Sequence, residues 1–128
     1  MLSFVQAIAR QERGWGTPTY SNPRNNPGDI EDGSFAQSHG ALPPDGNRFA
    51  AWPTEEGGFE AEAELLKDDY AGLTISQAIK KYAPAVENDD DIYIQNVCGW
   101  TGLLPTTVLT PTIIGCSFPV TLTDADPE

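Results

Sequence analysis

The spacing of apolar residues at the start of the chain predicts a helix with an acidic residue on its buried face. Val5, Ile8 and Ala9 lie seven, four and three positions before Glu12. All four side chains therefore share one face of a helix with 3.6 residues per turn. Gly14 follows almost at once, and glycine commonly occupies the position just past a helix end. The pattern predicts a helix that ends beside Glu12.

A second helical pattern begins after Thr54. Glu55 and Glu56 are acids suited to a first turn, and Gly72 closes the segment. Its apolar side chains recur at helical spacing, as Phe59, Ala63, Leu66 and Tyr70.

Two further helices are expected before residue 104. Residues 74–77 read Thr-Ile-Ser-Gln, a capping box that opens a helix, and Pro84 stops that helix. The acidic run 88–91 (Asn-Asp-Asp-Asp) suits the positive N-terminus of a last helix, which Gly102 closes. The predicted buried side chains of this last helix are Tyr93, Val97 and Trp100.

Strand-like residues lie between the first two helical patterns. Residues 15–29 are dense in Pro, Gly and Asn and predict an ordered loop. Residues 29–38 and 47–52 then show partial alternation, and a turn signal at residues 45–46 (Asp-Gly) separates them. We expect an α+β fold that is mainly helical, with a small antiparallel β-hairpin or sheet after the first helix. Without alternating strands and helices, a nucleotide-binding sheet is not expected.

The length of 128 residues fits one domain. We place this domain at residues 1–104 and expect residues 105–128 to form an irregular extension packed on it or trailing from it. Cys98 and Cys116 fit no zinc pattern. They would form either a disulfide that fastens the extension to the last helix or two buried thiols.

The formal charge of −12 excludes nucleic acid as an expected partner, because phosphate contacts require clustered Lys and Arg. The acidity favours either activity at acid pH or simply the solubility of the protein.

The sequence contains no run of about 18 apolar residues, so no membrane span is predicted. No signal peptide is visible either. We expect a monomer without cofactor or metal. His39 in a turn gives no sign of a catalytic triad.

Glu12 is the residue whose placement points to chemistry. Partial burial and the negative end of the helix dipole would both raise its pKa, which suits a general acid working near neutral pH. The alternative is a surface glutamate paired with one of the arginines at positions 10, 13 and 24.

Aromatic and amide side chains accompany this carboxylate, a composition that suits a carbohydrate site. The aromatic side chains able to stack on sugar rings are Trp15, Tyr20, Tyr82 and Tyr93. The groups able to form hydrogen bonds are Asn25, Asn26 and the backbone of residues 27–29. Trp52 and Trp100 are assigned to the core.

Several short motifs occur in a characteristic order. They are Ala-Ile-Ala-Arg-Gln-Glu (7–12), Arg-Asn-Asn-Pro-Gly-Asp-Ile (24–30), Phe-Ala-Ala-Trp-Pro-Thr (49–54), Lys-Tyr-Ala-Pro (81–84), Glu-Asn-Asp (87–89) and Tyr93. Over residues 3–104 this order resembles the superfamily of goose-type lysozymes and soluble lytic transglycosylases. The likeness is greatest to a small phage and bacterial branch with an Asn-Asn-Pro-Gly-Asn loop.

The resemblance implies a lysozyme-like fold with a glycan groove. It also implies cleavage of the β-1,4 bond between N-acetylmuramic acid and N-acetylglucosamine in peptidoglycan. The catalytic glutamate of the family corresponds to Glu12, and its groove-lining loop corresponds to residues 26–30, including Asn26, Gly28, Asp29 and Ile30. Its late tyrosine corresponds to Tyr82. We therefore expect a secreted, periplasmic or phage-associated protein that acts on the cell wall.

The chain departs from that branch in its acidity and in Asp29, which stands where the branch usually has Asn. Asp29, Glu31 and Asp32 are the candidates for a second catalytic carboxylate that holds a water. In a lytic transglycosylase the 6-hydroxyl of the substrate would attack instead. Two non-enzymatic hypotheses remain, a glycan-binding virion or envelope protein and an acidic inhibitor.

Overall fold

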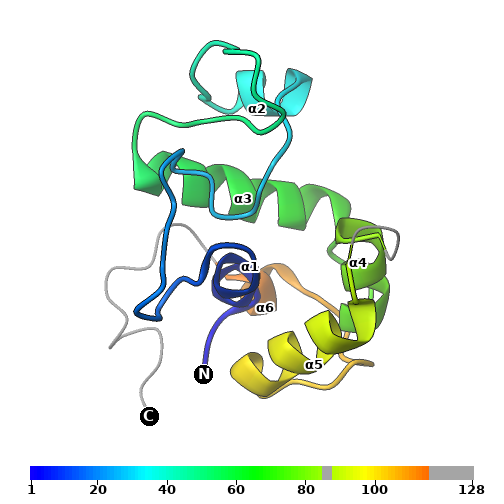
Figure 1. The fold of residues 1–128 in the computed structure, drawn as a ribbon. Coiled ribbons are helices and arrows are strands. Elements are labelled where there is room, and N and C mark those ends of the chain that lie inside the picture. The colour runs from blue at the N-terminus through cyan, green and yellow to red at the C-terminus, as the bar shows by residue number, and fades with distance from the viewer. Residues whose placement is uncertain (85–87, 116–128) are drawn as a thin grey trace.

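The computed structural model describes residues 1–84 and 88–115, and the described part of the chain is mainly helical (Figure 1). Within these ranges the helices are α1 (Phe4–Arg13), α2 (Ser34–Ser38), α3 (Glu55–Asp69), α4 (Ile75–Tyr82), α5 (Asp90–Thr101) and α6 (Pro111–Ile114). None of them is long and apolar enough to cross a lipid bilayer.

Helix α1 lies at the centre of the molecule, in contact with α3, α5 and α6 (Figure 1). Ser3 and Gln6 form a capping box at its start. Gly14 ends it with φ of 78°, a left-handed conformation that is cheap for glycine. Val5 and Ile8 are buried, as their spacing predicts. The predicted helix and its end point are confirmed.

The other predicted helices are also present. Thr54 caps α3 through its side chain, and Thr74 with Gln77 forms the predicted capping box of α4. Asp89 caps α5, so the acidic run starts a helix, as expected. Trp100 differs from the prediction. It is partly exposed, and the Arg10 guanidinium lies 5.4 Å from its ring centre.

The predicted β-hairpin or sheet is wrong, and with it the α+β class. Residues 1–84 and 88–115 contain two isolated bridges, Glu31 with Phe49 and Thr74 with Val108, and no strand. The first bridge consists of two hydrogen bonds, from the N–H of Asp32 to the Arg48 carbonyl (2.9 Å) and from the N–H of Ala50 to the Ile30 carbonyl (3.0 Å), and it does not extend into a strand.

The physical reason is competition from side chains for the backbone donors. Asn26 accepts from the N–H of Ile30 and donates to the Ala50 carbonyl, the two backbone groups that the next rung of the ladder would join. Such local bonds replace the ladder that a hairpin would form. Residues 34–38, expected to be extended, instead form α2.

Two clusters of buried side chains lie on either side of α3. The large one is built on α1, α3, α4 and α5. The small one, under α2, consists of Ile30, Ala36, Ala50, Trp52 and Ala61. Residues 22–31 connect α1 to the small cluster, and this connecting segment carries the groups described next.

The segment after α5 packs back on the helices. Leu109 is fully buried and exchanges backbone hydrogen bonds with residues 72 and 73. The short α6 contacts α1 and α3, although no helical pattern marks it in the sequence. The described residues do not include Glu87, Cys116 or the acidic C-terminal residues. Whether Cys98 and Cys116 form a disulfide therefore stays a prediction.

Candidate active site

A cleft of about 410 Å³ opens at the C-terminal end of α1. Its size lies in the range of ligand pockets. Its walls come from the end of α1, the connecting segment, residues 48–49 before α3, the end of α4 with the two residues after it, and residue 88 just before α5. The lining residues are Glu12, Gly28, Asp29, Glu31, Arg48, Phe49, Lys81, Tyr82, Ala83, Pro84 and Asn88.

Glu12 is half-buried at the wall of this cleft. Burial is the main cause that raises its pKa from 4.5 to about 7, and a hydrogen bond with Asp29 and the Asp29 charge raise it further. The hydroxyl of the buried Tyr93 donates to Oε2 at 2.8 Å and, with the charge of Arg13, acts in the opposite direction. Around neutral pH, Glu12 therefore exists in both protonated and ionised forms.

Asp29 lies beside Glu12 because of an unusual backbone conformation. Its φ is 53°, in the left-handed region that Asn and Asp tolerate better than most side chains. The Arg13 guanidinium lies 3.3 Å from its Oδ1 and holds the carboxylate in place. Asp29 is thereby held close enough to Glu12 for its side chain and its charge to raise the Glu12 pKa.

Asn26 fixes the shape of the segment that carries Asp29. Its side chain is buried and donates to the carbonyls of Ile30 and Ala50, both at 2.9 Å. Its Oδ1 accepts from the N–H of Ile30. Each polar atom of the amide is paired, so Asn26 stabilises the cleft wall from behind.

A buried pair, Glu62 and Tyr82, supports the same segment from the side of α3. Glu62 is fully buried and Tyr82 Oη lies 2.7 Å from its Oε2. The Tyr82 hydroxyl also bonds the carbonyl of Gly28. A side chain at position 28 would collide with both groups, which explains the glycine. Burial raises the pKa of Glu62 to about 8.

The structure brings together five of the nine predicted catalytic and sugar-binding residues. Glu12, Gly28, Asp29 and Tyr82 line the cleft, and Tyr93 lies behind Glu12.

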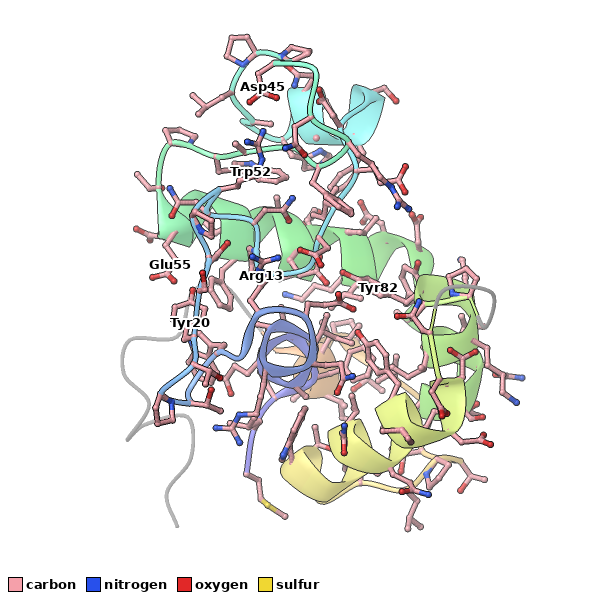
Figure 2. All side chains as sticks on the ribbon, viewed as in Figure 1. Arg13, Tyr20, Asp45, Trp52, Glu55 and Tyr82 are labelled. Carbon is pink, nitrogen blue, oxygen red and sulfur yellow. The ribbon has the colours of Figure 1, made fainter. Side chains whose placement is uncertain are left out.

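The other four predicted sugar-binding residues do not line the cleft. Tyr20 bonds Glu55 at the start of α3, whereas Tyr82 lies near its far end (Figure 2). Asn25 donates to the Trp52 carbonyl, and Asn26 and Ile30 are buried in structural roles. Their predicted contacts with substrate are therefore not supported by their positions.

Two of the alternatives considered from the sequence are also clarified. Trp15 is 8% exposed and belongs to the large cluster, so it is not a stacking platform. Asp32 bonds Gly33 and Gln37 beside α2 and does not line the cleft. Glu31 does line it, and pairs with Arg48 at 2.8 Å.

Glu62 was not predicted, although a signal for it exists. It follows Phe59 by three positions and precedes Leu66 by four, so it shares their helix face. This is the same criterion that identified Glu12. Arg48, Lys81 and Asn88 also line the cleft. Lys81 and Asn88 lie within two of the quoted motifs, but neither was singled out as a site residue, and no motif includes Arg48.

A second hollow, of about 430 Å³, lies near α2. His39, Trp52, Glu60 and Glu64 are among its lining residues, but Trp52 is almost fully buried and both glutamates are on the exposed face of α3. It contains no buried carboxyl group, so the first cleft is the better candidate for chemistry.

In comparisons with known proteins, no protein family, no curated protein and no solved structure matches this chain. The resemblance to lysozyme-like proteins therefore stays a prediction from the motifs, and the site is interpreted from its own geometry.

Proposed function

We propose that the protein is a peptidoglycan-cleaving glycosidase, a muramidase or lytic transglycosylase, with Glu12 as general acid. The observation that carries this proposal is the half-buried Glu12 carboxyl group at the wall of an open cleft, with a pKa of about 7. The motif resemblance supplies the substrate, the β-1,4 bond between N-acetylmuramic acid and N-acetylglucosamine.

In this proposal protonated Glu12 donates its proton to the glycosidic oxygen as the bond to the anomeric carbon breaks. The ionised carboxylate then accepts a hydrogen bond from Tyr93 and the charge of Arg13 stabilises it. The Glu12 carboxylate can next act as a base that accepts the proton of the attacking group, either a water or the 6-hydroxyl of the substrate. Activity would fall as pH rises through about 7, because the proton is then lost before the reaction.

Asp29 is a poor candidate for the second catalytic carboxylate. In inverting enzymes the two carboxyl groups are roughly 6.5–9.5 Å apart, which leaves room for a water on the opposite face of the sugar. Asp29 is instead hydrogen-bonded to Glu12. Its position supports a role in setting the Glu12 pKa, and it leaves two routes: Glu31 holding a water, or attack by the 6-hydroxyl of the substrate.

The test is incubation of the protein with purified peptidoglycan at pH 4–8, followed by mass analysis of released muropeptides. Anhydro ends would identify a lytic transglycosylase and reducing ends a hydrolase. Absence of product at every pH would contradict the proposal.

The acidic surface favours one alternative, a lysozyme-like domain that binds glycan without cutting it. Co-sedimentation with the same peptidoglycan distinguishes it, because such a protein would pellet with the wall and release nothing.

A further inference from the structure

The hydrogen bonds around Tyr82 cannot all be satisfied if Glu62 is ionised. The Tyr82 hydroxyl has one hydrogen and two neighbouring acceptors, Glu62 Oε2 and the Gly28 carbonyl. A carbonyl never donates. If the hydroxyl donates to Gly28, the hydrogen between Tyr82 and Glu62 must therefore come from Glu62.

The surroundings of Glu62 also favour a neutral carboxylic acid. The residue is fully buried, and its other oxygen, Oε1, has no hydrogen-bond partner among the described residues. An unpaired carbonyl-type oxygen is tolerable in a protein interior, whereas an unpaired anionic oxygen is costly. No salt bridge to Glu62 is found in the described part of the chain.

We propose that Glu62 is a positioning residue: as a neutral acid it donates to Tyr82, which donates to the Gly28 carbonyl and so fixes the segment that holds Asp29 against Glu12. The chain of contacts runs from α3 through α4 to the cleft wall, and Tyr82 lies at the junction of these elements (Figure 2). The catalytic consequence rests on the proposed function, but the contact chain does not.

Ionisation of Glu62 would release the Gly28 carbonyl. A carboxylate is a stronger acceptor than a carbonyl, so the single Tyr82 hydrogen would turn toward Glu62 and leave Gly28 without its donor. The Tyr82 hydroxyl keeps its hydrogen in this range, because burial raises its pKa well above 10.

The titratable groups that interact electrostatically with Glu62 come from every neighbouring element. They are Glu12 on α1, Asp29 on the connecting segment, Tyr70 at the end of α3, Tyr82 on α4 and Tyr93 on α5. The two carboxylates, when ionised, keep Glu62 neutral to higher pH, since like charges oppose its ionisation.

The experiment follows the carbonyl carbon of Gly28 by NMR from pH 5 to 10, in the wild type, Glu62→Gln and Tyr82→Phe. Glutamine imitates the neutral acid, because its amide can donate to Tyr82. We expect a chemical-shift step near pH 8 in the wild type that is absent in both variants. The step from Glu12 near pH 7 should remain in Glu62→Gln. Glu64→Gln, on the exposed face of α3, is the matched control.

The activity arm measures peptidoglycan cleavage against pH. Loss of the Glu12 proton should make the wild-type rate fall about tenfold per pH unit above 7. Loss of the Glu62 proton as well should make it fall about a hundredfold per unit above 8. In Glu62→Gln the tenfold slope should continue, so at pH 9 the variant should be about tenfold faster, each rate being normalised to pH 6.

A wild-type Gly28 carbonyl that does not respond between pH 7 and 10 would overturn the proposal, even if a variant fails to fold. A step that persists in Glu62→Gln, or a large loss of activity of this variant at pH 6, would also overturn it. If the wild type cleaves no glycan, the proposed function fails, while the NMR arm still decides the role of Glu62.

Discussion

Replacing Glu12 by Gln should stabilise the folded protein, and the gain should grow with pH. The native pKa of Glu12 is about 7, against 4.5 for an ordinary glutamate. Because the folded-state value is the higher one, the folded protein binds the proton more tightly than the unfolded chain. The stabilisation from this proton is fully present below pH 4.5 and is lost as pH rises to about 7.

The size of the effect follows from the two pKa values. One pH unit corresponds to about 1.4 kcal/mol of differential interaction, so the 2.5-unit difference amounts to about 3 kcal/mol. Glutamine does not ionise and avoids this loss. Between pH 5 and 7 the free energy of unfolding of Glu12→Gln, relative to wild type, should therefore rise by about 1.4 kcal/mol per pH unit and then level off.

Urea unfolding followed by tryptophan fluorescence measures this difference, because Trp15 and Trp52 are both buried. Glu64→Gln is the control for removing one carboxylate from an acidic surface. At pH 8 the variant should melt about 10 °C higher than the wild type. A stability difference that stays constant from pH 5 to 8, or does not exceed that of the control, would refute the perturbed environment of Glu12.

Two other substitutions test the cleft wall. Asp29→Asn suits the left-handed backbone, removes the charge that raises the Glu12 pKa, and replaces a carboxylate by an amide that can donate to ionised Glu12. We expect cleavage within a few-fold of wild type at pH 5 and an alkaline limb displaced to lower pH. Loss of activity at all pH values would instead give Asp29 a chemical role. Gly28→Ala places a methyl group against Glu62 and Tyr82; overpacking of this kind should cost about 1–3 kcal/mol. A melting temperature within 1 °C of wild type would contradict the close packing.

The helices were predictable because their signals are local. Apolar spacing, capping residues and terminal glycines lie within a few positions of one another, and α1, α3, α4 and α5 follow them closely. Glu12 was found by the same means, since a carboxylate on an apolar helix face is visible in the sequence.

The sheet prediction failed because local alternation does not show which groups satisfy the backbone. Asn26 takes the N–H of Ile30 and the carbonyl of Ala50, which a strand pair would join, and nothing in the spacing of apolar residues reveals this. Asn26 was expected to contact substrate because its amide can form hydrogen bonds and because the resemblance places it in the groove-lining loop. Its amide nitrogen instead donates to the carbonyls of Ile30 and Ala50.

The remaining site residues depend on tertiary packing. Arg48 comes to the cleft from the segment before α3, and Lys81 and Asn88 come from the end of α4 and the residue pair before α5. Tyr20 and Tyr82 are both tyrosines near polar groups in the sequence, yet one bonds Glu55 and the other the cleft wall. Only the path of the chain between them distinguishes these roles.

The most direct test of the central claim compares muropeptide release by the wild type and Glu12→Gln at pH 5–6, where wild-type Glu12 is protonated. We predict that the wild type releases muropeptides and that Glu12→Gln, although folded and more stable, is slower by about a thousandfold. A folded Glu12→Gln protein that releases them at a substantial fraction of the wild-type rate would show that this carboxyl group is not the acid.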